Sequence, residues 1–143
     1  MPAENILLLP GMMCDERLWS HQIAAFDVPV SVADTSKSDN FADMAAQALA
    51  AAPPSFAMAG LSMGGILAFE IWRQAPERVT HLALLDTNPH PDEPSRKSIR
   101  FEQIAAAAAG KLEELAIESL KPLYLAKKNR NDETMLKIIL DMA

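Results

Sequence analysis

The chain has 143 residues, of which half are apolar, and a formal net charge of −6 at pH 7. The apolar content excludes intrinsic disorder, and the length suffices for one domain with a hydrophobic core. The negative charge argues against nucleic acid or an anionic membrane as a partner. The lone cysteine, Cys14, excludes an internal disulfide and a cysteine-based zinc site.

The first predicted element is a short buried strand over residues 5–9, which ends at Pro10-Gly11. Its apolar run, Ile6–Leu9, is too short for a signal-peptide core or a membrane span, and no basic region precedes it. We therefore expect a cytoplasmic protein without a membrane partner. Asp15 then has the position of a helix cap, which predicts a helix from Glu16 to about Phe26.

Strands and helices continue to alternate through the first part of the chain. We expect a strand over residues 28–33, a helix over Phe41–Ala51, a strand over 55–60, a helix over 63–75 and a strand over Val79–Leu85. The last strand is apolar almost throughout, which is typical of a strand buried on both faces. This alternation predicts an α/β fold, with a mostly parallel sheet and helices on both of its faces.

After Asp86 the pattern becomes helical, with helices predicted over residues 95–109, 111–120 and 132–142 and no further strand candidate. A loop with three prolines, over residues 88–95, separates the two patterns. The sequence therefore predicts two parts. Residues 1–90 form the sheet and its helices, and residues 91–143 form a helical segment.

The most informative motif is Gly60-Leu61-Ser62-Met63-Gly64, which lies between a predicted strand and a predicted helix. Gly-x-Ser-x-Gly at such a junction is typical of a nucleophile elbow. The tight turn strains the serine backbone and lifts its hydroxyl above the sheet. The helix that begins there aims its free N–H groups at the same spot. Ser62 is therefore the candidate nucleophile.

Together, several motifs resemble the N-terminal half of a bacterial α/β-hydrolase. They are Leu8-Leu9-Pro10-Gly11-Met12-Met13, Trp19, Gly60-Leu61-Ser62-Met63-Gly64-Gly65, Pro76-Glu77-Arg78-Val79 and Leu84-Leu85-Asp86-Thr87. The resemblance covers residues 5–86, in order and spacing as well as in motifs. It implies an α/β-hydrolase core that is incomplete here. The helical tail resembles the start of the cap that such enzymes insert after the strand ending at Asp86.

This resemblance implies a role for each residue of the site. Ser62 is implied as the nucleophile, and the backbone N–H groups of Met63 and Met12 as the oxyanion donors. Pro10 stands where many relatives carry a histidine, which leaves a backbone donor intact. Met13 is implied to line the acyl pocket with Met12. The implied partner is a small-molecule acyl substrate, and no metal or organic cofactor is implied.

A serine nucleophile needs a general base, and the family's triad runs serine, acid, histidine along the chain. The acid and the histidine usually follow strands that come after the cap. We therefore expect these 143 residues to be the N-terminal part of a longer enzyme and to be inactive alone. His21 and His81 are poorly placed for the base, and His90 is more simply a solvated loop residue.

Asp86 is a candidate for the acid, because a minority of such enzymes carry the acid at the end of this strand. The alternative, which we favour, is that Asp86 braces the loop leading into the cap.

The function implied is hydrolysis of a small carboxylic ester or related acyl bond through an acyl-enzyme. Two alternatives stay open. The first is a non-catalytic fragment or interaction module that keeps the scaffold. The second is another reaction on the same fold, namely C–C bond hydrolysis, a thioesterase or a cofactor-free perhydrolase.

The strand Val79–Leu85 has no candidate partner along its outer edge. An apolar strand with an unpaired row of backbone N–H and C=O groups is a template for another chain. The sequence therefore predicts a self-associated or poorly soluble chain, or a partner that covers this edge, such as the C-terminal half of the longer enzyme. The alternative is that the helical tail, residues 95–142, folds over the edge and covers it.

Overall fold

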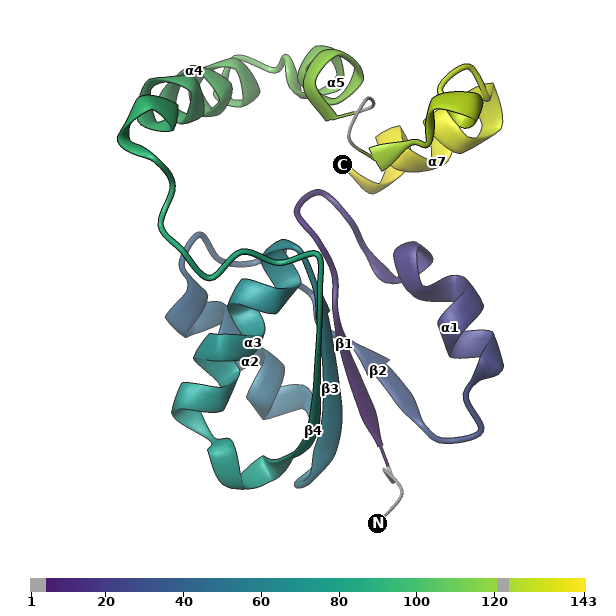
Figure 1. Cartoon of the computed structure of the whole chain (residues 1–143), viewed down its shortest axis with the longest axis vertical. Coiled ribbons are helices and arrows are strands. Elements are labelled where there is room, and N and C mark those ends of the chain that lie inside the picture. The colour runs from purple at the N-terminus through teal and green to yellow at the C-terminus, as the bar shows by residue number, and fades with distance from the viewer. Residues whose placement is uncertain (1–4, 121–123) are drawn as a thin grey trace. The chain divides into compact units, whose positions relative to one another are not determined.

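A four-stranded parallel sheet forms the centre of the first of two units (Figure 1). The computed structural model describes residues 5–120 and 124–143, and the boundary between the units falls between Pro89 and His90. The strands are β1 (Ile6–Leu9), β2 (Val30–Val32), β3 (Phe56–Leu61) and β4 (Val79–Leu85). Their order in the sheet is β2-β1-β3-β4, so β1 and β3 are central.

Helices cover both faces of this sheet, as Figure 1 shows. The helix α1 (Ser20–Ala25), preceded by the 3₁₀ turn η1 (Glu16–Trp19), lies on one face. The helices α2 (Phe41–Ala51) and α3 (Met63–Gln74) lie on the other, and the short η2 (Pro76–Arg78) leads into β4. This confirms the predicted α/β class.

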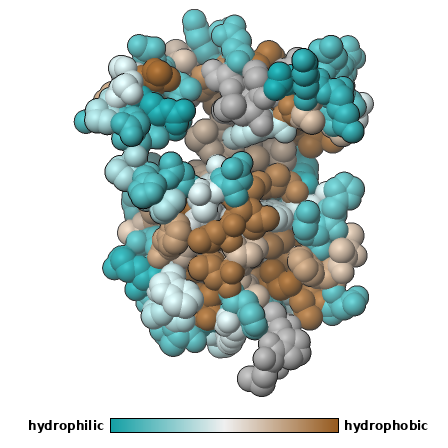
Figure 2. Space-filling view, viewed as in Figure 1, coloured by the Kyte–Doolittle hydropathy of each residue, from teal (hydrophilic) through white to brown (hydrophobic). Residues whose placement is uncertain are grey.

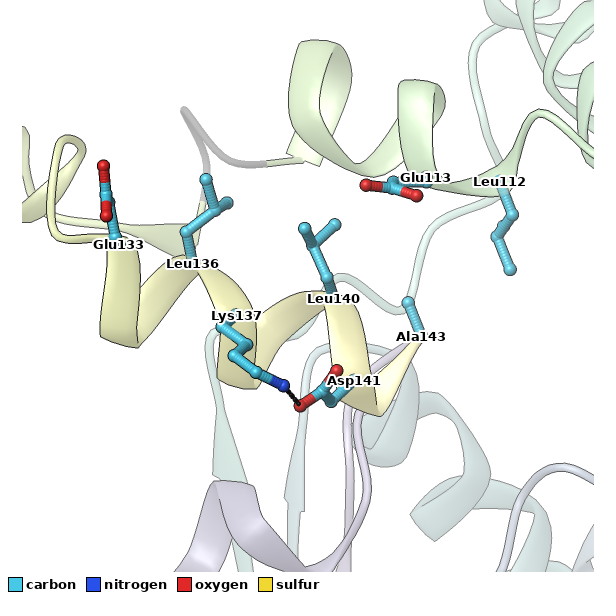
Figure 3. A pocket seen from close by; sticks show the side chains of 8 residues that line it. All are labelled: Leu112, Glu113, Glu133, Leu136, Lys137, Leu140, Asp141 and Ala143. Carbon is cyan, nitrogen blue, oxygen red and sulfur yellow. Dashed lines mark hydrogen bonds and ion pairs between the residues drawn. The ribbon is translucent and has the colours of Figure 1, made fainter.

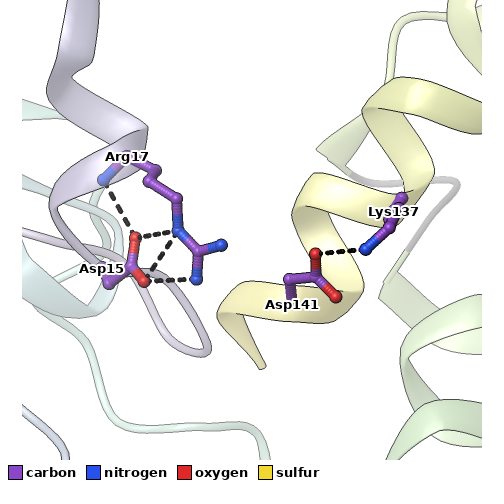
Figure 4. Close-up of polar contacts among 4 residues, drawn as sticks. All are labelled: Asp15, Arg17, Lys137 and Asp141. Atoms are coloured by element: carbon purple, nitrogen blue, oxygen red, sulfur yellow. Dashed lines mark hydrogen bonds and ion pairs between the residues drawn. The ribbon is translucent and has the colours of Figure 1, made fainter.

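Side chains at the helix ends explain where the helices begin. The Asn40 side chain accepts a bond of 2.9 Å from the Asp43 N–H at the start of α2. The Asp15 carboxylate caps η1 by accepting from the Arg17 N–H and also binds the Arg17 guanidinium (Figure 4). These bonds from Arg17 lower the pKa of Asp15. The predicted cap at Asp15 is confirmed.

The core of the first unit lies between the sheet and the helices α2 and α3. Alternate residues of β3 face this core, as expected for a strand with period-two burial. The buried members of the core are Leu7, Leu9, Ala33, Met44, Ala45, Ala48, Phe56, Met58, Leu67, Ala68, Ile71 and Val79.

Arg78 ties the end of α2 to the start of β4. Its guanidinium donates to four backbone oxygens around the α2 C-terminus at 2.7–3.3 Å and lies 5.5 Å from the centre of the Phe56 ring. The carbonyl oxygens that end a helix have no partner within it, so one cation satisfies several of them. The acceptors are the carbonyl oxygens of Leu49, Ala52, Pro53 and Pro54.

The second unit is helical over its described residues. It contains η3 (Pro94–Arg96), α4 (Lys97–Ala108), α5 (Leu112–Leu115), the π-helical turn η4 (Ala116–Leu120), η5 (Lys127–Asn129) and α7 (Glu133–Met142). Asp132 caps α7 by accepting from the Met135 N–H. The three helices predicted for this part are confirmed, although the second changes from α to π after Leu115.

One expectation about the sheet is wrong. Every residue of β4 except Val79 is exposed, whereas the apolar pattern predicted burial on both faces. The physical reason is its place in the sheet. Among residues 5–120 and 124–143, β4 pairs with β3 alone, so its outer edge carries no neighbour.

Candidate active site

The turn between β3 and α3 holds Ser62 in a strained conformation. Its φ is +53° and its ψ is −114°, a region that residues with a side chain rarely adopt. The side chain of Ser62 makes no capping bond to α3, so the helix begins without a side-chain acceptor at its N-terminus. Ser62 is also exposed. This strain at an exposed serine is the geometry that the elbow motif predicts.

Three glycines allow the turn to be this tight. A Cβ on Gly60 would collide with the carbonyl group of Gly64, and one on Gly64 with the carbonyl oxygens of Leu9 and Pro10. A Cβ on Gly65 would lie 2.5–2.7 Å from the side chain of Thr87. The elbow therefore fits only because these positions carry no side chain: Gly60 and Gly64 lie against backbone, and Gly65 lies against the Thr87 side chain.

The turn after β1 lies directly against the elbow. A Cβ built on Gly11 would lie 3.8 Å from the Ser62 Cβ and 3.6 Å from the Leu61 carbonyl oxygen. The Cys14 N–H closes this turn on the Gly11 carbonyl at 3.2 Å, and Met13 has a φ of +58°. The structure thus brings the segment that carries Met12 and Met13 to the nucleophile.

Cys14 does not compete with Ser62 as a nucleophile. Its half-buried position raises the pKa of the thiol, and the nearby charge of Asp15 raises it further. At neutral pH the thiol is therefore protonated, whereas only the thiolate is strongly nucleophilic.

The end of β4 also contacts Ser62. The Ser62 N–H donates to the Leu85 carbonyl oxygen at 2.9 Å, so β3 and β4 stay paired up to the elbow. Asp86 follows with a φ of +43° and an exposed side chain. The acid candidate therefore lies at the same end of the strands as the nucleophile.

The histidines of the described residues give Ser62 no base within the first unit. His21 lies on α1, and the His81 ring contacts the Thr80 hydroxyl at 3.1 Å. No hydrogen bond joins either ring to Ser62. His90 is the first residue of the second unit and is exposed.

The sequence alone indicated no role for Thr87, although this residue ends the motif Leu84-Leu85-Asp86-Thr87. The Thr87 hydroxyl donates to the Ser62 carbonyl oxygen at 2.7 Å. One signal was available: a third glycine, Gly65, follows the motif, and it leaves the space that the Thr87 side chain fills.

Two cavities away from the Ser62 turn carry no comparable chemistry. One of about 540 Å³ lies in the second unit, between α5 and α7, and it is lined by leucines and by the Lys137–Asp141 ion pair (Figures 3 and 4). Another, of about 320 Å³, lies beside Asn5 and Pro29 at the N-terminal ends of β1 and β2. Ligands of open α/β sheets bind at the opposite end, where Ser62 lies.

Among residues 5–120 and 124–143, no group of three histidine, cysteine or carboxylate side chains is placed to hold a metal ion. The described helices include none that is long and apolar enough to cross a membrane.

Solved structures of hydrolases share this architecture. A thermophilic esterase from Thermogutta terrifontis matches with a TM-score of 0.76 at 24% identity, covering 96% of this chain and 57% of the esterase. An enol-lactonase from Burkholderia xenovorans matches with a TM-score of 0.78 at 19% identity, covering 99% and 59%. The chain has the α/β-hydrolase fold.

Other comparisons define the extent of this likeness. A hydrolase from Pseudomonas aeruginosa shares the α/β-hydrolase fold at a TM-score of 0.77 and 18% identity, over 96% of this chain and 57% of its own. The chain therefore spans less than two thirds of the length of each of these three structures. No family model matches the sequence, and no curated protein matches it.

Proposed function

We propose that the protein is a serine hydrolase that cleaves a small carboxylic ester or a related acyl bond. The observation that carries the proposal is the positive φ of Ser62 at the β3–α3 junction, with the Gly11 turn packed against it. The names of the similar structures, an esterase and an enol-lactonase, support the same class of chemistry.

In the proposed reaction, the Ser62 Oγ attacks the carbonyl carbon of the substrate. The carbonyl oxygen becomes an oxyanion, which the backbone N–H groups of Met63 and Met12 stabilise. The general base takes the proton of the Ser62 hydroxyl during the attack and passes it to the alcohol as the alcohol leaves. The base then takes a proton from water, which attacks the acyl-enzyme, and returns that proton to Ser62 as the acid is released. Met12 and Met13 line the acyl side of the site.

The general base belongs to the proposal as well. The first unit offers Ser62 no histidine partner, so we place the base outside this unit. Asp86, at the C-terminal end of β4, remains the acid candidate. We propose the helical segment of residues 91–143 as part of a cap that shapes the specificity pocket. We place the reaction in the cytoplasm, without a metal or an organic cofactor.

Turnover of p-nitrophenyl esters tests this proposal. The longest natural form that carries this chain is compared with Ser62→Ala and with Ser55→Ala, the same change at the opposite end of β3. Removing a serine nucleophile costs on the order of a million-fold in kcat in a serine protease, so Ser62→Ala is expected to abolish turnover. Turnover that survives Ser62→Ala would refute the mechanism. Thioesters are tested beside the p-nitrophenyl esters, and faster turnover of thioesters would identify a thioesterase.

The 143-residue chain gives a second test. We expect it to turn over the same esters at no rate that depends on Ser62. Turnover that both Ser62→Ala and His90→Ala abolish would show that the chain carries its own base at His90.

A further inference from the structure

The end of β4 holds the Ser62 backbone at two points. The Ser62 N–H donates to the Leu85 carbonyl oxygen at 2.9 Å, and the Thr87 Oγ1 donates to the Ser62 carbonyl oxygen at 2.7 Å. Between the two contacts, Asp86 turns the chain with a φ of +43°. Both backbone polar groups of the strained serine are therefore fixed by one short segment of a neighbouring strand.

The bond from Thr87 acts on more than Ser62. The peptide group between Ser62 and Met63 is planar and trans, so its C=O and its N–H point in opposite directions. A donor that fixes the Ser62 carbonyl therefore also fixes the direction of the Met63 N–H. A hydrogen bond to the carbonyl also polarises the peptide and strengthens its N–H as a donor.

The same carbonyl oxygen is the first acceptor of α3. It accepts from the Gly65 N–H at 3.0 Å and from the Ile66 N–H at 3.3 Å. These bonds run along the helix axis, whereas the Thr87 hydroxyl comes from the segment that follows β4. The peptide plane is therefore held in two directions.

The fit of Thr87 depends on the glycine after the elbow motif. A Cβ on Gly65 would lie 2.5 Å from the Thr87 Oγ1 and Cβ. Thr87 itself is half-buried. The Thr87 side chain thus fills the space that the missing side chain of Gly65 leaves.

We propose that Thr87 is a positioning residue of the oxyanion hole, which aims the Met63 N–H at the developing oxyanion by fixing the Ser62–Met63 peptide plane. The proposal rests on the proposed role of Ser62. Removing an oxyanion donor outright costs about 10²–10³ in kcat. Loosening a donor that is still present is expected to cost about tenfold to a hundredfold.

Two variants separate the hydroxyl from the shape of the side chain. Thr87→Val keeps the branched shape and removes the donor, while Thr87→Ser keeps the donor. In the longest natural form, we expect Thr87→Val to lower kcat about tenfold or more with KM nearly unchanged. Thr87→Ser is expected to keep kcat close to the wild-type value. Equal kcat values in the wild type and Thr87→Val, per titrated active site, would overturn the proposal.

A readout independent of turnover uses the amide resonance of Met63. The ¹⁵N shift of an amide responds to a hydrogen bond on the preceding carbonyl, so we expect it to move in Thr87→Val and to stay in Thr87→Ser. An unmoved Met63 resonance in Thr87→Val overturns the positioning role. If the wild type shows no activity that depends on Ser62, the proposed function fails, and the Met63 resonance still decides whether Thr87 fixes the peptide.

Discussion

The backbone of Gly64 at the start of α3 touches the Leu9 carbonyl at the end of β1, so closely that a Cβ on Gly64 would collide with it. This contact brings the first turn of α3 against the segment that follows β1. Gly11, Met12 and Met13 therefore reach Ser62, although about fifty residues separate them in sequence.

Gly64→Ala tests this close approach. The added methyl group has no space between the two backbones, so we expect the free energy of unfolding to fall by about 1–3 kcal/mol or more. Gly11→Ala is the control, because its Cβ would make only ordinary contacts, at 3.6 Å or more. Urea unfolding measures both variants, and a Gly64→Ala protein as stable as Gly11→Ala would contradict the geometry.

Arg78 provides a second stability test. Its guanidinium satisfies carbonyl oxygens at the end of α2, and hydrogen bonds to charged groups contribute about 1.5–3 kcal/mol each. We expect Arg78→Ala to lower the free energy of unfolding by about 2–4 kcal/mol, since the carbonyls partly regain water. Arg73→Ala is the matched control, because its surface ion pair with Glu70 is screened by solvent and contributes little to stability. Similar losses of stability in both variants would contradict the role of Arg78 in satisfying the carbonyl oxygens at the end of α2.

The pH dependence of stability has an identifiable source in α3. Hydrogen bonds from Arg73, and then from Gln74, lower the pKa of Glu70 from 4.5 to about 2. A carboxyl with a depressed pKa in the folded state stabilises above its unfolded pKa, and this stability is lost as the pH falls from about 4.5 to 2.

Glu70→Gln is therefore expected to flatten the fall in stability over this range, as followed by thermal unfolding at several pH values. Arg73→Gln removes the main cause of the shift and should flatten the fall in part, because Gln74 still donates to Glu70. An unchanged slope in Glu70→Gln would show that other carboxyls dominate acid unfolding.

The order of strands and helices, the cap at Asp15 and the elbow at Ser62 could be predicted from sequence because each depends on local patterns. The open outer edge of β4 could be predicted as well, but the exposure of its residues could not, because an apolar run of this kind is typical of a strand buried on both faces. Thr87 was missed for a related reason: its contact with Ser62 spans 25 residues and depends on the register of β3 against β4.

The open edge of β4 predicts association between chains. Leu82, Leu84 and Leu85 are each about 40% exposed, and hydrophobic residues gather on the face of the first unit that carries this strand (Figure 2). On α3, Phe69 and Trp72 are exposed as well. No charged residue lies in β4 to block pairing, so we propose that copies associate through this edge.

Light scattering over a range of concentrations measures this association. Mass should increase with concentration for the wild-type chain, and Leu84→Lys, which places a charge on the edge strand, should reduce the increase. A monomer at all concentrations that unfolds cooperatively would contradict the proposal and favour the helical tail as a cover.

Covalent labelling by a fluorophosphonate tests the central claim, that Ser62 is an activated nucleophile. In the longest natural form that carries this chain, mass spectrometry of the digested protein is expected to find one adduct, on the peptide that contains Ser62. The adduct should be absent from Ser62→Ala and present in Ser55→Ala. An unlabelled Ser62 in the folded protein, or equal labelling of the Ser62→Ala variant, would contradict the account.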